Sequence, residues 1–199
     1  YLNQPALAFE DPDGLKLVLM VNGDHTIPKV WHYNPYTDVP SEHQILGMGP
    51  VELHLRNLAP TIDFLTNVLG YQAHPSDENV YTLDQSGRYS DFVLVEEQGE
   101  SVKPGRGYVH HIAVSIPTDE ALQTVLEKLD QLPGNNSGII DRYFFKSIYY
   151  RNNKILYEFA TEAPGFTVDT DVKDLGSKLT LPDFLEHKRD EIERQLKEI

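Results

Sequence analysis

Two short segments decide the fold of this chain: Tyr108-Val109-His110-His111-Ile112-Ala113-Val114 and Ile155-Leu156-Tyr157-Glu158-Phe159-Ala160. Both are rich in β-branched and aromatic residues and are bounded by Gly or Pro, which is typical of β-strands. A helix and a further strand region, 141–150, lie between them. Two histidines and a glutamate on neighbouring strands, with Arg142 and several tyrosines between them, indicate a candidate metal site. Neutral imidazole and carboxylate ligands with open coordination positions suit non-haem Fe(II).

Composition and charge exclude several classes of partner. The 199-residue chain has a formal net charge of −14, which argues against nucleic acid and anionic membranes because both attract basic surfaces. It has no cysteine, so disulfides and cysteine nucleophiles are excluded, and a reducing, cytoplasmic location is expected. No apolar run approaches the ~18 residues that a membrane span needs, and the first residues do not form a signal peptide.

Residues 47–97 and 107–162 show the same order of predicted elements. In the first unit, a half-buried strand at 51–55 is followed by a helix over 60–69, which has Pro60 in its first turn and Gly70 just past its end. Strands follow near 80–83 and 90–96. The second unit repeats this order, with its helix beginning after the N-cap Thr118 and strands over 139–150 and 154–161. We therefore predict two βαβββ units, because an internal repeat decides the architecture before local detail does.

Three further segments flank these units. Residues 1–22 form a hairpin that matches the end of a preceding βαβββ unit, and 23–46 form a Pro-rich linker. Residues 163–199 form a tail that ends in a helix from about residue 182. The first residue is not Met, which indicates a fragment or a processed chain. Because open sheet edges need pairing, we expect the hairpin to pair with 47–97 and the protein to form a homo-oligomer.

The paired units resemble the vicinal oxygen chelate superfamily, which contains glyoxalase I, bleomycin-resistance proteins and extradiol dioxygenases. The resemblance is most specific in four segments, which look like the C-terminal half of the hydroquinone-type ring-cleaving dioxygenases: Val109–Ala113, Asp141–Arg151, Leu156–Phe166 and Leu179–Pro182. It implies an α+β fold in which paired βαβββ modules form curved mixed sheets, followed by a C-terminal helix. It also implies a metal-dependent dioxygenase that uses O₂ to cleave a hydroquinone-like or catechol-like aromatic substrate.

The resemblance also implies roles for five residues. His111 and Glu158 would be two of three ligands to Fe(II) or Mn(II), and the third would come from a unit preceding Tyr1. His110, Tyr149 and Arg142 match catalytic or substrate-contacting positions. Val18 and Gly49 occupy the corresponding positions in the hairpin and the first unit, so we expect no metal there. With two ligands in this chain, we expect weak metal binding and an incomplete enzyme.

The residues themselves constrain these roles. Successive strand residues face opposite sides, so His110 and His111 cannot both bind one metal. His110 or Tyr149 would move a proton, and Arg142 would hold a phenolate or a developing carboxylate. Glu52 and His54 share a strand face and could form a competing site. Two alternative functions stay open: a glyoxalase-like lyase or isomerase, and a metal-free module that binds a small molecule.

Overall fold

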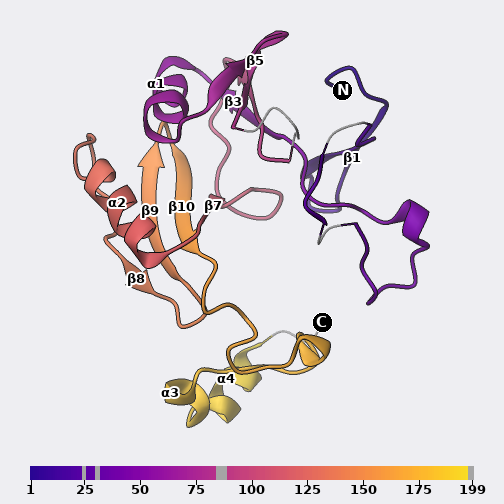
Figure 1. The fold of residues 1–199 in the computed structure, drawn as a ribbon, viewed down its shortest axis with the longest axis vertical. Helices are drawn as coiled ribbons and strands as arrows, with labels where there is room; N and C mark the ends of the chain where they lie inside the picture. The colour runs from indigo at the N-terminus through magenta and orange to yellow at the C-terminus, as the bar shows by residue number, and fades with distance from the viewer. Residues whose placement is uncertain (24–25, 30–31, 84–88, 197–199) are drawn as a thin grey trace. The chain divides into compact units, whose positions relative to one another are not determined.

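The computed structural model describes residues 1–23, 26–29, 32–83 and 89–196. The chain divides into two compact units, Tyr1–His110 and His111–Ile199. Their described strands form one two-stranded and two four-stranded sheets (Figure 1). Each four-stranded sheet belongs to one βαβββ unit, which confirms the predicted α+β fold with paired modules.

The second unit contains β7 (Ile112–Ile116), α2 (Asp119–Leu129), β8 (Ile140–Asp141), β9 (Lys146–Asn152) and β10 (Ile155–Thr161). Its strands lie in the order β7-β10-β9-β8. β10 pairs in parallel with β7 and antiparallel with β9, so the two segments that decide the fold are neighbours in the sheet. Helix α2 contacts β7, β9 and β10 (Figure 1).

Helix α2 covers one face of this sheet. The predicted N-cap is confirmed, because Thr118 Oγ1 accepts a hydrogen bond of 3.1 Å from Ala121 N. Leu122 and Leu129 lie on one side of the helix and are fully buried. The face of the sheet that carries odd-numbered β10 residues supplies the other half of this core, with Ile148, Tyr150, Tyr157 and Phe159. The opposite face is therefore left for the even-numbered residues of β10, which include Glu158.

The sequence did not predict the turn that separates β8 from β9. The region 139–150 was expected to be strand, but residues 142–145 form a turn that Arg142 N closes by donating to Phe145 O at 2.8 Å. Tyr143 adopts a left-handed conformation with φ of 70°. Its N–H donates to the Asp141 carboxylate at 2.7 Å, and such local bonding to an Asp side chain stabilises a tight turn.

The first unit follows the same plan with one local difference. Its sheet has the order β3-β6-β5-β4. The elements are β3 (Val51–Leu55), α1 (Ala59–Asp63), η3 (Phe64–Val68), β4 (Gln72–His74), β5 (Asp77–Thr82) and β6 (Phe92–Glu96). The short strand β4 was not predicted. The predicted helix over 60–69 becomes a π-helical turn in η3, and this turn directs Phe64 and Leu65 together into the core.

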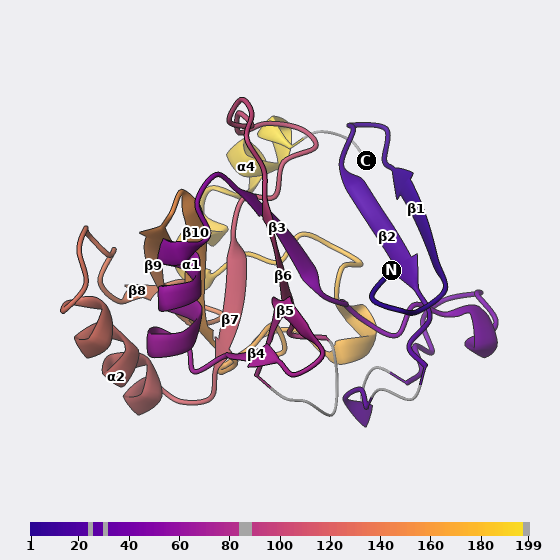
Figure 2. The ribbon, with the colours of Figure 1, turned by 90° about the horizontal axis from the view of Figure 1, so that it is seen from above.

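The N-terminal hairpin is a separate two-stranded sheet of β1 (Ala6–Glu10) and β2 (Lys16–Met20) (Figure 2). In the described part of the chain, neither strand joins the sheet of 47–97, so the expected pairing with that unit is wrong. Leu7, Phe9, Leu17 and Leu19 share one face of the hairpin and are all exposed.

The remaining described elements are short. The linker contains η2 (Ser41–His43), and the tail contains η4 (Val172–Asp174), α3 (Asp183–Glu186) and α4 (Arg189–Gln195). The predicted C-terminal helix is thus present as two segments, and residues 197–199 lie outside the described part. Among the described helices, none combines the length and apolar character needed to cross a membrane.

Replacing Leu122 by Ala should destabilise the second unit, because Leu122 is fully buried under the sheet. Large-to-small changes of this kind cost about 2–5 kcal/mol of unfolding free energy. Leu175→Ala makes the same chemical change at a residue that is 43% exposed, and it should cost less than about 0.5 kcal/mol. Urea unfolding followed by circular dichroism measures both. Equal destabilisation by the two variants would contradict the assignment of α2 to the core.

Candidate metal centre

The register of β10 places Glu158 between two other strands. Glu158 lies opposite Ala113 of β7 and opposite Tyr149 of β9. Its neighbours along β10, Tyr157 and Phe159, point to the helix-covered face and are buried. Glu158 itself is 4% exposed, although it points away from α2. A carboxylate this deeply buried must be partnered, because burying an unpaired charge is costly.

His111 is the first of these partners. It directly precedes β7 and lies on the same face as Ala113 and Glu158, since side chains alternate along a strand. Its Nε2 atom lies 2.8 Å from Oε2 of Glu158. The His111 side chain is 33% exposed, so the imidazole is the accessible member of the pair. The structure thus brings the two predicted ligands together from adjacent strands.

Tyr149 is the second partner. Its hydroxyl donates to Oε1 of Glu158 at 2.5 Å, so each carboxylate oxygen has a different partner. The rings of Tyr149 and His111 are nearly perpendicular, with centroids 6.2 Å apart. The position of Tyr149 could have been found from the sequence, because counting strand residues outward from the Asn153-Lys154 turn places Tyr149 opposite Glu158.

Arg142 completes the group. The turn between β8 and β9 holds its backbone, and its guanidinium carbon lies 5.5 Å from the centroid of the Tyr149 ring. This distance is that of a cation–π contact. His110 is exposed, and it is the last residue of the compact unit Tyr1–His110. The catalytic roles given to His110, Tyr149 and Arg142 therefore stay predictions.

The donor atoms of His111 and Glu158 fit a metal ion as two of its ligands. Nitrogen and carboxylate ligands lie about 2.0–2.2 Å from such a metal, so neighbouring donors at right angles lie about 3 Å apart. The observed 2.8 Å between Nε2 and Oε2 agrees with this spacing. Within the part of the chain that the structure describes, no group of three or more His, Asp or Glu side chains is arranged to bind a metal.

Known proteins share this architecture over almost the whole chain. The chain is 34% identical over 205 residues to "Putative ring-cleaving dioxygenase MhqA" of Bacillus subtilis (strain 168), covering 97% of the chain and 63% of that protein. The chain is also 31% identical over 204 residues to "Putative ring-cleaving dioxygenase MhqE" of the same organism, covering 98% of the chain and 64% of that protein. The crystal structure of a Bacillus subtilis protein described as a putative dioxygenase matches 99% of the chain and 66% of that protein, with a TM-score of 0.82 and 26% identity.

These relatives and the paired βαβββ units support a place for the chain in the vicinal oxygen chelate superfamily. No protein-family model matches the sequence. The chain spans somewhat less than two thirds of the length of the relatives that it matches.

The first unit carries a polar cluster that the sequence revealed only in part. His54 Nδ1 lies 2.5 Å from Glu97 Oε2, and His54 Nε2 lies 2.7 Å from Glu52 Oε1. The Tyr1 hydroxyl donates to the other oxygen of Glu52 at 2.8 Å. Because both ring nitrogens of His54 face carboxylates, this group favours an imidazolium ion pair over a metal site. Glu97 and Tyr1 were missed because the alternation of β3 indicates only its own residues.

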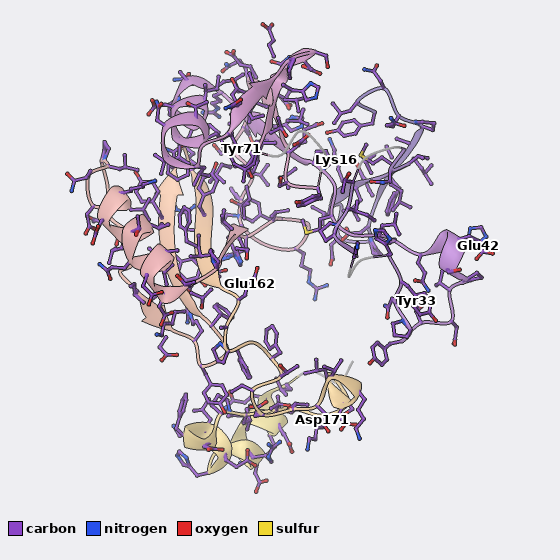
Figure 3. All side chains as sticks on the ribbon, in the orientation of Figure 1. Lys16, Tyr33, Glu42, Tyr71, Glu162 and Asp171 are labelled. Atoms are coloured by element: carbon purple, nitrogen blue, oxygen red, sulfur yellow. The ribbon has the colours of Figure 1, made fainter. Side chains whose placement is uncertain are left out.

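The two units use equivalent positions differently. The strand registers align His54 with Ser115 and Glu97 with Glu162, and Ser115 Oγ donates to Glu162 Oε1 at 2.5 Å. Glu162 lies just past the end of β10 (Figure 3). The same alignment places Pro50 at the position of His111 and Gly49 at that of His110. The expected correspondence of Gly49 with the ligand position is therefore wrong by one residue, and Pro50 has no ligating side chain either.

Stability should depend on pH through His54. Its hydrogen bonds to Glu97 and Glu52 raise the pKa of His54 above its usual value, so the folded protein binds this proton more tightly than the unfolded chain. The resulting stabilisation is complete below the unfolded pKa and is lost as pH rises through the folded pKa. The wild-type protein should therefore lose part of its unfolding free energy between about pH 6 and about pH 9, and His54→Gln should lose less over the same range. Urea unfolding at the two pH values measures this difference.

The size of this effect should be small. The His54 side chain is 48% exposed, so solvent screening keeps the contribution below about 1 kcal/mol. His43→Gln, at an exposed histidine in η2, is the matched control and should leave the pH dependence unchanged. A pH dependence that is the same in His54→Gln and wild type would contradict the ion-pair assignment.

Proposed function

We propose that this chain carries the metal-binding part of a ring-cleaving dioxygenase, with His111 and Glu158 as two of the protein ligands. The observation that supports this most directly is the 2.8 Å separation of His111 Nε2 and Glu158 Oε2. The carboxylate is buried while the imidazole is accessible, which is an arrangement that a cation can enter from one side. The relatives named ring-cleaving dioxygenases support the reaction class.

The metal would be Fe(II) or Mn(II), because imidazole and carboxylate ligands with open positions suit these ions. When bound, such an ion brings O₂ and a phenolic oxygen of the substrate together and activates both for cleavage of the aromatic ring. The family set of two histidines and one glutamate leaves one histidine to be supplied. We propose that it comes from a βαβββ unit outside the described residues, since Val18 and Pro50, at the positions of Glu158 and His111, cannot ligate.

The side chains around the pair would handle the substrate. The substrate would be a small hydroquinone-like or catechol-like aromatic compound. Arg142 would attract its phenolate through charge, and Arg142 is held in place by its contact with the Tyr149 ring. The Tyr149 proton is engaged by Glu158, so we propose His110 as the residue that accepts a phenol proton.

His111→Ala should abolish metal binding by this chain. Removing one of two ligands leaves only the Glu158 carboxylate, and the affinity should fall by more than the 10–100-fold typical of losing an outer partner of a ligand. Mn(II) titration followed by electron paramagnetic resonance measures the free ion directly. His54→Ala is the matched control, because His54 also lies 2.7 Å from a glutamate, and it should bind Mn(II) as wild type does. Unchanged binding by His111→Ala would reject the proposal.

Oxygen uptake tests the reaction class. With excess Fe(II), and with the missing βαβββ unit supplied in cis or as a separate fragment, the chain should consume O₂ when hydroquinone or catechol is added, and His111→Ala should not. His110→Ala should keep its metal and consume O₂ more slowly. A glyoxalase-like lyase or isomerase would consume no O₂ with either compound. A chain that binds metal and turns over a substrate without O₂ would therefore refute the dioxygenase assignment.

A further inference from the structure

The two oxygens of the Glu158 carboxylate have separate partners. Oε1 accepts the Tyr149 hydroxyl at 2.5 Å, whereas Oε2 lies 2.8 Å from His111 Nε2. The tyrosine bond is short, as expected when a carboxylate accepts from an O–H group. Oε2 is therefore the carboxylate oxygen that faces Nε2 of His111. The carboxylate cannot turn its second oxygen toward that side without breaking the bond to Tyr149.

Three strand pairs of the described residues, β9–β10, β5–β6 and β1–β2, can be compared at the position of the tyrosine and the carboxylate. The cross-strand pair Tyr149–Glu158 of the second unit corresponds to Val80–Val93 of the first unit. The corresponding pair in the N-terminal hairpin is Ala8–Val18. In all three, the next pair is built from apolar or aromatic residues, such as Tyr81–Phe92 and Phe9–Leu17. Where the carboxylate is absent, the tyrosine is absent too.

Two contacts fix the Tyr149 ring. The Arg142 guanidinium lies 5.5 Å from the ring centroid, and the His111 ring meets it edge-on at 6.2 Å. The backbone of Tyr149 is tied as well, because its N–H donates to Ser137 Oγ at 2.8 Å. The hydroxyl is thus delivered to Oε1 by a side chain with little freedom to move away.

We propose that Tyr149 is a positioning residue that withholds Oε1 of Glu158 from the metal, so that the glutamate binds through Oε2 alone. Arg142 acts through Tyr149 by fixing its ring. A glutamate that binds through one oxygen leaves one more coordination position open, which a ring-cleaving reaction needs because substrate and O₂ must both reach the metal. This inference rests on the proposed function, and it assigns to Tyr149 a role other than proton transfer.

The test counts exchangeable water on Mn(II) bound to the chain. Tyr149→Phe removes only the hydroxyl and keeps the ring, so Oε1 becomes free to bind the metal and should displace one water molecule. The water-proton relaxation rate per bound Mn(II) should fall by the contribution of that water. The affinity for Mn(II) should fall by less than about tenfold, because a new ligand replaces the lost hydrogen bond.

Tyr150→Phe is the matched control. Tyr150 is the next residue of β9, points to the helix-covered face and donates to Pro133 O at 2.8 Å, so its loss should leave the water count unchanged. Arg142→Met keeps the Tyr149 hydroxyl but removes the contact that fixes its ring. Like Tyr149→Phe, it should lower the water-proton relaxation rate per bound Mn(II). Arg142→Lys keeps a cation over the ring and should restore the wild-type value. Should Tyr149→Phe fail to fold, the two Arg142 variants decide the question.

The outcomes separate this inference from the proposed function. Failure of the wild-type chain to bind Mn(II) even when the missing βαβββ unit is supplied, or unchanged binding by His111→Ala, rejects the proposed function and the inference with it. Mn(II) binding with an unchanged water count in Tyr149→Phe overturns the inference and leaves the ligand assignment standing. An affinity loss of about 10–100-fold with no change in water also overturns it, because that result would show that Tyr149 merely orients the glutamate.

Discussion

The pairing of β10 with a strand on each side is the constraint on which the second unit depends. Its even-numbered face brings Glu158 between His111 and Tyr149, and its odd-numbered face buries Tyr157 and Phe159 beneath α2. Because side chains alternate along a strand, a register shift of one residue would exchange these faces. The carboxylate would then enter the apolar core and the rings would face outward. One strand therefore fixes both the core and the candidate metal centre.

Burial of a carboxylate links the stability of this unit to its chemistry. A carboxyl group that is 4% exposed requires hydrogen-bonding partners, since burying a polar group without a partner is costly. Glu158 finds these partners in Tyr149 and His111, which are the residues that the proposed function needs beside it. Substitutions there would consequently affect folding as well as the proposed metal binding, which is why the isosteric change of Tyr149 to Phe is informative.

Elements that depend on local chemistry or on a repeat could be predicted from the sequence, and those that depend on tertiary contacts could not. The N-cap Thr118 and the two βαβββ orders follow from local patterns, and the closeness of His111 and Glu158 follows from strand pairing. The left-handed Tyr143 escaped prediction because a tyrosine gives no signal for that conformation. The partner Glu97 of His54 escaped it because Glu97 lies 43 residues further along the chain, just past β6. The metal-binding roles themselves stay predictions.

The topology of the candidate centre has a consequence for the order of folding. Tyr149 and Glu158 belong to one hairpin and are separated by nine residues, whereas His111 reaches the carboxylate only after α2 and β8 have been placed. Closing a short loop costs less chain entropy than closing a long one, and local contacts form first. We therefore expect the tyrosine bond to form before the histidine arrives. The Glu158 carboxylate would be buried with its Tyr149 partner already in place, and the contact between His111 and Glu158 would be among the last to form.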